Sequence, residues 1–181
     1  GMAAYGLRPC IEVQFADYVY PAYDQIVSEA ARLRYRSNGQ FTCPMVIRMP
    51  TGGGIFGGQT HSQSPEALFT HVSGLKVVVP SNPYDAKGLL LASVADDSPV
   101  VFLEHRWLYK NTGDVPAEIY TLPLGKAAHL HRGDQLTVVA NSLAAVHALT
   151  AVEQHGLDVD LIDPRTIKPL AHTLLESTSS V

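Results

Sequence analysis

Short β-branched segments alternate with helical patterns along the chain, and this alternation restricts the fold more than any other feature. Residues 77–79 are consecutive valines, which is typical of a strand buried on both faces of a parallel sheet. Between residues 21 and 35 the apolar side chains recur at helical spacing. Strands and helices in alternation predict an α/β fold, a parallel sheet flanked by helices with right-handed crossovers.

The same patterns place each expected element on the sequence. Strands are expected at residues 11–15, 45–49, 77–79, 100–103, 136–140 and 159–162. Helices are expected at residues 21–35, 84–94 and 143–154. A further helix is expected to open after Ser64, which is a suitable N-cap ahead of Pro65 and Glu66.

Residues 111–123 show neither the alternation of a strand nor the apolar spacing of a helix, and they contain a glycine and two prolines. We therefore interpret them as a linker. The chain then divides into a first domain at residues 2–110, a linker at 111–124 and a second α/β unit at 125–181. Two strands and one helix cannot cover both faces of a parallel sheet. We therefore expect the second unit to be only the beginning of a domain, and the chain to be a piece of a longer protein, truncated at both ends.

Charge and cysteine content exclude several classes of protein. The chain has 13 basic and 17 acidic side chains, so it has no positive excess with which to bind nucleic acid or an anionic membrane surface. No apolar run approaches the roughly 20 residues that span a bilayer. Cys10 and Cys43 are too few for a disulfide framework and indicate a reducing compartment. We expect a cytoplasmic protein with no nucleic-acid or membrane partner.

A glycine-rich loop follows the second expected strand. Residues 52–57 carry the glycine spacing of a dinucleotide-binding fingerprint, but the loop continues to His61 before a helix can begin. Val79 is followed by Pro80 rather than by the acidic residue that binds a ribose. A nucleotide-binding oxidoreductase requires a helix that starts at Gly57, which we do not expect. The glycines instead allow the backbone to approach a ligand or a neighbouring subunit closely.

His61 lies where α/β sheets bind ligands, in a loop after the carboxyl end of a strand. Because imidazole exchanges protons near neutral pH, His61 is a candidate for proton transfer. An aromatic cluster of Phe15, Tyr18, Tyr20 and Tyr23 follows the first expected strand. The cluster has two interpretations, core packing or a flat platform for a ring ligand.

Two other groups of side chains are of the kind that binds metal ions. Asp96 and Asp97 end a helix, where a carboxylate opposes the helix dipole, so they are either solvated or compensated by a bound cation. His129 and His131 would share one face if their segment were extended, but without an evident third ligand they do not predict a transition-metal site.

Three segments, residues 14–26, 48–67 and 80–90, resemble the β subunits of thiamine-diphosphate-dependent 2-oxo acid dehydrogenases. The nearest pattern is the bacterial type of branched-chain 2-oxo acid dehydrogenase E1 β subunit, and the resemblance runs from Met2 to about Leu170. It implies a transketolase-like pyrimidine-binding domain followed by the start of the C-terminal domain of that family. The motifs are long, and they are far more specific than the glycine spacing alone.

The resemblance also implies an activity. In this family the E1 component is an α2β2 heterotetramer with thiamine diphosphate between an α and a β subunit. The α subunit holds the diphosphate through Mg²⁺, and the β subunit holds the aminopyrimidine. The component decarboxylates branched-chain 2-oxo acids and passes the acyl group to a lipoyl group on the E2 partner. The cofactor supplies the chemistry, while protein groups orient it and move protons.

Particular residues are implied by the matching motifs. Tyr18 is expected against the aminopyrimidine ring with Gln14 nearby, and His61 is expected to assist proton transfer during lipoyl acylation. A structural K⁺ is also implied, since oxygen-only ligation suits a hard cation. Its ligands would be the backbone carbonyls of Met45, Ser93 and Ser98 together with Asp96.

The chain also departs from the family pattern. The glutamate that activates the cofactor lies upstream of the first residue in this family, and most of the C-terminal domain follows Leu170. We therefore expect this polypeptide to be inactive without an α subunit and the missing parts. The alternatives are a pyruvate-specific E1 β subunit or the pyrimidine domain of another thiamine enzyme, such as transketolase. A non-enzymatic alternative is an assembly module that associates with itself through apolar surfaces.

Overall fold

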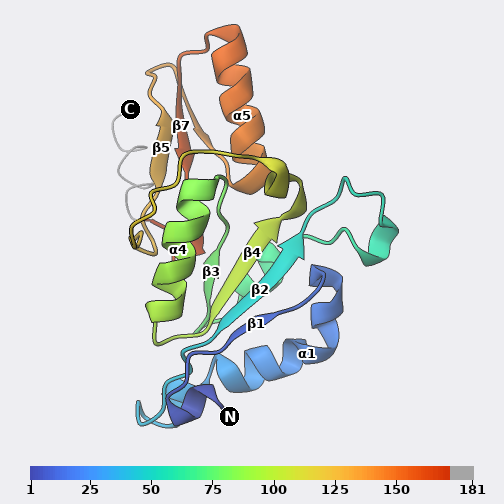
Figure 1. Ribbon diagram of the computed structural model, residues 1–181, viewed down its shortest axis with the longest axis vertical. Coiled ribbons are helices and arrows are strands. Elements are labelled where there is room, and N and C mark those ends of the chain that lie inside the picture. The colour runs from blue at the N-terminus through green and yellow to red at the C-terminus, as the bar shows by residue number, and fades with distance from the viewer. Residues whose placement is uncertain (172–181) are drawn as a thin grey trace.

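The computed structural model describes residues 1–171 and is built on a central five-stranded sheet (Figure 1). The strands of this sheet are β1 (Cys10–Glu12), β2 (Val46–Thr51), β3 (Lys76–Val78), β4 (Val100–His105) and β8 (Thr166–Lys168). Their spatial order is β1-β2-β4-β3-β8, and the first four strands are parallel. β8 pairs with β3 in the antiparallel direction.

Side chains alternate along the strands and build a core on each face of this sheet. Ile47 and Met49 pack into a cluster with Phe69, on the side where the first helices lie. Val46 and Phe102 face the opposite side and pack against Leu89 of α4 (Pro83–Ala95). Figure 1 shows α1 (Tyr20–Asp24) and α4 on opposite sides of the strands. The predicted α/β sheet flanked by helices is confirmed.

The first helical region is less regular than its period suggests. After the 3-10 helix η2 (Ala16–Val19) come α1, a π-helical segment η3 (Gln25–Ala30) and α2 (Leu33–Arg36). The chain begins with another 3-10 turn, η1 (Ala3–Tyr5). The helical period predicts which face of a segment is buried. Ile26 is buried as that period requires, although it lies in the π-helical segment.

Two local expectations were wrong. The first strand ends at Glu12, because Val13 N makes the last ladder bond to Arg48 O (2.9 Å) and the chain then turns into η2. Ser64 is not a cap, because α3 (Glu66–Thr70) begins one residue later and Pro65 occupies the N-cap position without a side-chain hydrogen bond.

The second unit forms its own small sheet. Its strands are β5 (Ala128–His131), β6 (Leu136–Val139) and β7 (Val159–Asp163), in the order β5-β7-β6. β6 and β7 are parallel, whereas β5 is antiparallel to β7. α5 (Ser142–His155) packs on this sheet through Val152 and Leu149 (Figure 1). β5 and β8 were not expected, and residues 172–181 of the expected second unit lie outside the described residues.

The segment that was interpreted as a linker has neither helix nor strand between residues 111 and 127, yet it packs along α4. Leu122 N donates to Gly88 O (3.1 Å), and the ring of Tyr120 stacks on that of Tyr84 at 4.7 Å. Lys87 Nζ donates to carbonyls of the same segment, including Glu118 O at 2.9 Å. The segment is therefore held by specific contacts.

A buried polar cluster joins the two units where β7 leads into β8. Ser81 Oγ donates to Asp163 Oδ2 (2.5 Å), and Arg165 donates to Asp85 Oδ1 (3.1 Å) and to the carbonyl of Lys126. Burial raises the pKa of Asp163 to about 6, against the opposing effect of the Ser81 hydrogen bond. Because these contacts span the two units, they and the β3–β8 pairing hold them together.

Two further observations concern membrane-spanning helices and metal sites. Within residues 1–171, no helix is long and apolar enough to cross a membrane. The same residues contain no cluster of three or more His, Cys, Asp or Glu side chains that could hold a metal ion. His129 Nδ1 instead lies 2.9 Å from Asp160 Oδ1, and His131 Nδ1 lies 2.7 Å from the carbonyl of Val159.

Candidate functional site

Tyr18 and His61 meet at the carboxyl end of the central sheet. Tyr18 belongs to η2, and His61 follows the 3-10 turn η4 (Gly58–Thr60), yet Tyr18 Oη and His61 Nε2 lie 2.8 Å apart. Their ring centroids are 5.6 Å apart and nearly perpendicular, at 71°. The two residues implied for ring binding and proton transfer therefore share one location.

Phe15 completes an aromatic cluster around the histidine. Its ring centroid lies 4.5 Å from that of His61 and 5.7 Å from that of Tyr18, both in edge-on geometry. Tyr23 points elsewhere, since its ring packs on Phe69 at 5.6 Å and its hydroxyl donates to Leu68 O. Core packing therefore describes Tyr23, whereas Phe15 and Tyr18 form a partly exposed aromatic wall.

The hydrogen bonds of His61 indicate which ring nitrogen carries the proton. His61 Nδ1 lies 3.2 Å from Gly57 O and 2.8 Å from Thr60 Oγ1. A carbonyl oxygen only accepts, so the Gly57 contact places the proton on Nδ1. Nε2 then accepts from the Tyr18 hydroxyl. In this arrangement Nε2 is the nitrogen that can take a proton from a reacting group.

A small hollow of about 250 Å³ borders Tyr18. It is lined by Asp17, Tyr18, Tyr20, Gln59, Thr60 and Gln63. Asp17 Oδ2 accepts from Gln63 N (3.3 Å), while Asp17 Oδ1 is buried and has no hydrogen-bond partner among the described residues. A buried acceptor beside an exposed aromatic ring suits a flat ligand that carries N–H groups. Gln14 precedes this cluster with an exposed side chain.

The glycine loop packs against the end of β4. A Cβ atom at Gly52 would lie 2.0 Å from His105 Nε2, and one at Gly54 would lie 1.8 Å from Trp107 Nε1. Both glycines have positive φ angles, +84° and +89°. The close neighbours of these glycines are therefore side chains of the same chain, in β4 and in the 3-10 helix η5 (Arg106–Lys110). Only the short turn η4 follows Gly57, so the helix that a dinucleotide site requires is not there.

Arg106 was not predicted as a site residue, but the structure places it beside the cluster. Its guanidinium carbon lies 5.0 Å from the centroid of the Phe15 ring. No sequence spacing connects the two residues, because β1 and β4 are separated by β2 in the sheet. The one available signal was the position of Arg106 directly after a buried strand, where α/β folds bind ligands.

The residues implied for K⁺ lie at the opposite end of α4 from its N-cap. Met45 O accepts from Val100 N (2.9 Å), and Ser93 O accepts from Asp96 N (3.3 Å). Asp96 Oδ1 accepts from Ser98 N (2.8 Å). The second carboxylate oxygen of Asp96 forms an ion pair with Lys76. The sequence argument for an uncompensated carboxylate was therefore wrong, because β3 supplies a cation from within the chain.

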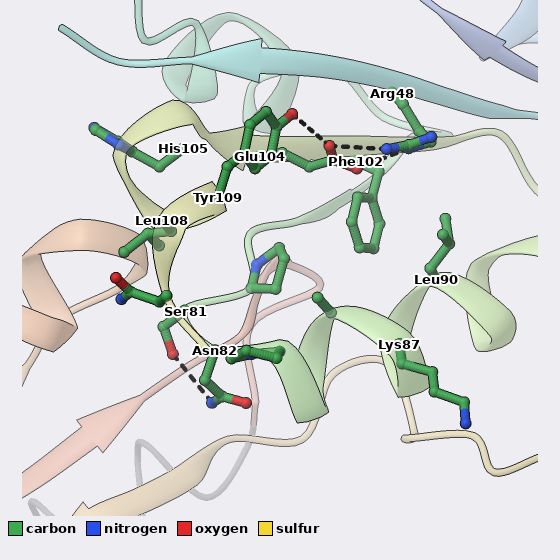
Figure 2. A pocket seen from close by; sticks show the side chains of 14 residues that line it. Arg48, Ser81, Asn82, Lys87, Leu90, Phe102, Glu104, His105, Leu108 and Tyr109 are labelled. Carbon is green, nitrogen blue, oxygen red and sulfur yellow. Dashed lines mark hydrogen bonds and ion pairs between the residues drawn. The ribbon is translucent and has the colours of Figure 1, made fainter. Parts of the chain in front are cut away.

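A larger pocket of about 320 Å³ lies between α4 and the ends of β3 and β4 (Figure 2). Glu104 accepts two hydrogen bonds from Arg48, at 2.7 and 3.0 Å, and one from Tyr109 at 2.7 Å. Burial and this bond to Glu104 raise the pKa of Tyr109. Figure 2 shows the three polar side chains on one wall, opposite Leu90 and Lys87 of α4. None of the predicted site residues lines this pocket.

Comparisons with known proteins agree with this architecture. Residues 1–112 match the family described as "Transketolase, pyrimidine binding domain", and residues 125–180 match "Transketolase, C-terminal domain". A solved structure named "Split gene transketolase, inactive beta4 tetramer" has a TM-score of 0.75 at 19% identity, covering 99% of this chain and 56% of that one. This likeness supports the fold alone.

Several curated relatives are considerably more similar in sequence. The chain is 54% identical over 187 residues to "2-oxoisovalerate dehydrogenase subunit beta" of Pseudomonas aeruginosa, with 94% of this chain and 53% of the relative covered. It is 49% identical to the protein of that name from Bacillus subtilis, covering 99% of this chain and 56% of the relative. "Pyruvate dehydrogenase E1 component subunit beta" of Acholeplasma laidlawii is 50% identical, covering 98% and 56%.

The chain thus spans about half the length of these relatives. The family match covers the whole central sheet apart from β8, and it includes both Tyr18 and His61. The expected fold, a pyrimidine-binding domain with the beginning of a C-terminal domain, is confirmed by both family matches. The chain belongs to the transketolase pyrimidine-binding domain family.

Proposed function

We propose that this chain is part of the β subunit of a thiamine-diphosphate-dependent 2-oxo acid dehydrogenase, the E1 component that oxidatively decarboxylates branched-chain 2-oxo acids. The observation that carries the proposal is the Tyr18–His61 pair, in a chain 54% identical to a subunit of that name. The pair joins an exposed aromatic ring to a histidine whose Nε2 can accept a proton. Its partners are an α subunit in an α2β2 assembly and a lipoyl-bearing E2.

Three groups of this chain fit the aminopyrimidine of thiamine diphosphate. Tyr18 offers a ring that is 46% exposed, Asp17 offers a buried and unpartnered carboxylate oxygen, and Gln14 lies exposed before them. The cofactor, when bound, supplies the carbanion chemistry that releases CO₂ from a 2-oxo acid. The α subunit holds its diphosphate through Mg²⁺ in this proposal.

The role of His61 follows from its hydrogen bonds. Gly57 O holds the proton on Nδ1, and Tyr18 Oη orients Nε2. His61 can then take or return a proton at Nε2 while the acyl group passes to the lipoyl group of E2. Phe15 packs edge-on against the imidazole at 4.5 Å and excludes water from that side of the ring.

A structural K⁺ near Asp96 is a separate part of the proposal. The carbonyl oxygens of Met45, Ser93 and Ser98, together with the Asp96 carboxylate, are hard oxygen donors, as K⁺ prefers. Lys76 already balances Asp96, so K⁺ binding has to compete with the lysine ammonium for one carboxylate oxygen.

Location in the cytoplasm stays a prediction. Cys10 is exposed and Cys43 is buried, and both thiols are free. Burial raises the pKa of the Cys43 thiol. Free thiols are the usual state in a reducing compartment. The relatives include bacterial proteins and subunits described as mitochondrial.

The function is tested by reconstitution. This sequence replaces the matching segment of the Pseudomonas aeruginosa subunit, and the chimera is combined with the α subunit of that enzyme, thiamine diphosphate and Mg²⁺. We expect decarboxylation of 3-methyl-2-oxobutanoate, with His61→Ala abolishing acyl transfer to lipoyl-E2. This chain alone should bind thiamine diphosphate little or not at all in calorimetry, because the diphosphate site lies on α. Micromolar binding by the chain alone would contradict the two-subunit site.

Pyruvate is the alternative substrate, because the Acholeplasma laidlawii relative is a pyruvate dehydrogenase subunit at 50% identity. The ratio of kcat/KM for 3-methyl-2-oxobutanoate to that for pyruvate decides between them. A ratio above one supports the branched-chain substrate. The non-enzymatic alternative is self-association through exposed apolar side chains such as Phe56 and Ile119. It predicts a stable oligomer in sedimentation that the α subunit does not dissociate.

A further inference from the structure

Arg106 lies within the aromatic cluster but has no assigned role. It is the first residue of η5, directly after β4 ends at His105. Its guanidinium carbon lies 5.0 Å from the Phe15 ring centroid, and the same ring meets His61 edge-on at 4.5 Å. Phe15 is therefore a common neighbour of Arg106 and His61, and its ring relates the guanidinium to the histidine of the candidate site.

Most arginines of the chain have a carboxylate partner. Ion pairs with a carboxylate are formed by Arg8, Arg36, Arg48, Arg132 and Arg165. Arg32 and Arg34 form none but are exposed to solvent. Within residues 1–171, Arg106 is the one arginine that is half-buried and forms no ion pair. A partly desolvated guanidinium without a counter-ion is unusual and favours an anionic ligand.

The carboxylate beside Tyr18 does not neutralise Arg106. Asp17 precedes Tyr18 in η2, and its Oδ2 accepts from Gln63 N at 3.3 Å. No ion pair joins Asp17 to Arg106 in the described residues. A guanidinium above an aromatic ring keeps the N–H groups at its edge free to donate, and its planar fork matches a carboxylate in a bidentate arrangement.

We propose that Arg106 binds the carboxylate of the 2-oxo acid substrate at the rim of the Tyr18–His61 site. The inference rests on the proposed function, because a 2-oxo acid must approach this cluster. The guanidinium fork recognises the planar carboxylate, and the ring of Phe15 beside it offers apolar surface for the acyl chain. Arg106 is thus a substrate-binding residue that distinguishes a 2-oxo acid from an uncharged carbonyl compound.

Trp107 provides a direct measurement on this chain. It is the single tryptophan and the next residue after Arg106. Its fluorescence is followed while 3-methyl-2-oxobutanoate is added at constant ionic strength, with the methyl ester as the uncharged control. We expect a saturable change with the acid and none with the ester. Arg106→Gln should weaken the apparent affinity by about tenfold or more, as loss of a charge-assisted pair does.

A matched variant controls for loss of charge. Lys110 lies on the same short helix, with Nζ 5.6 Å from the Trp107 ring, so Lys110→Gln also removes a positive charge near the reporter. It should change the affinity less than about twofold, whereas Arg106→Lys should fall between wild type and Arg106→Gln. Circular dichroism confirms that each variant is folded. An equal response to the ester, or an Arg106→Gln titration like that of the wild type, overturns the proposal.

Two carboxylate sources could bind Arg106: the 2-oxo acid itself and acidic side chains of the lipoyl-bearing E2. Kinetics of the reconstituted E1 chimera distinguish them. With ferricyanide as the electron acceptor no lipoyl protein is needed, and Arg106→Gln should raise KM for the 2-oxo acid by about tenfold or more while half-saturation by thiamine diphosphate is unchanged. If only the KM for the lipoyl protein rises, Arg106 recognises acidic side chains of E2 and the proposal is wrong. A chimera inactive on every 2-oxo acid refutes the proposed function, whereas the fluorescence titration still decides the role of Arg106.

Discussion

Tyr18 Oη lies 2.8 Å from His61 Nε2, so one hydrogen bond joins two short 3-10 segments that are 43 residues apart. The bond has two consequences. It fixes the imidazole with Nε2 directed at Tyr18 Oη, and it anchors the hydroxyl of Tyr18, whose side chain lines the hollow beside it. The ring binding proposed for Tyr18 and the proton transfer proposed for His61 would therefore be coupled through a single contact.

Removal of the Tyr18 hydroxyl separates these two roles. In the reconstituted chimera, Tyr18→Phe keeps the ring but loses the hydrogen bond to His61, which is worth about 1 kcal/mol. The rate of acyl transfer to the lipoyl group should fall by roughly five- to tenfold, while half-saturation by thiamine diphosphate changes less than about twofold. Tyr35→Phe, at an exposed position, is the control. A large loss of cofactor affinity without a loss of transfer rate would show that the hydroxyl serves the cofactor instead.

Asp163 makes the stability of the chain depend on pH. An unfolded aspartate loses its proton near pH 3.8, whereas buried Asp163 keeps its proton up to about pH 6. Between these values the folded state binds more protons, so stability falls as pH rises from about 4 to 6, by on the order of 3 kcal/mol. Urea unfolding at several pH values should show this slope in the wild type and lose it in Asp163→Asn. Asp114→Asn, at an exposed position, should retain it.

The contact between Gly54 and Trp107 predicts a strong effect of a single methyl group. Gly54→Ala would place Cβ 1.8 Å from Trp107 Nε1 at a φ of +89°, so both overlap and backbone strain oppose it. We expect a loss of about 2–4 kcal/mol in the free energy of unfolding. Gly58→Ala has a φ of +63° but open space, and should lose only about 1 kcal/mol. Equal losses in the two variants would mean that Trp107 does not pack on the loop.

The K⁺ proposal predicts opposite effects of two substitutions. The melting temperature is compared in KCl and in choline chloride at equal ionic strength. Asp96→Ala should abolish any increase caused by K⁺, because it removes the charged ligand. Lys76→Met should enlarge the increase, because it removes the competing ammonium group. A K⁺ effect that survives Asp96→Ala would refute the assigned ligands.

Much of the fold follows from local patterns in the sequence. The valines at 77–79 and the apolar period around residues 84–94 become β3 and α4 within two residues of the predicted bounds. Such patterns are reliable because alternation in a strand and the 3.6-residue period in a helix both record which side chains are buried. The location of His61 also followed from sequence, since loops after parallel strands meet at one edge of the sheet.

Other features depend on pairings that no local pattern records. β8 adds to β3 across 88 residues of sequence, from Val78 to Thr166, because the free edge of the central sheet accepts a strand from any part of the chain. Lys76 neutralises Asp96, and Arg106 approaches Phe15, only because β3, β4 and β1 lie in one sheet. Local patterns were sufficient to predict which segments are strands and helices and which loop carries the histidine. They could not predict which charges are paired, or that Arg106 forms no ion pair within residues 1–171, because ion pairing depends on the order of strands in space rather than along the chain.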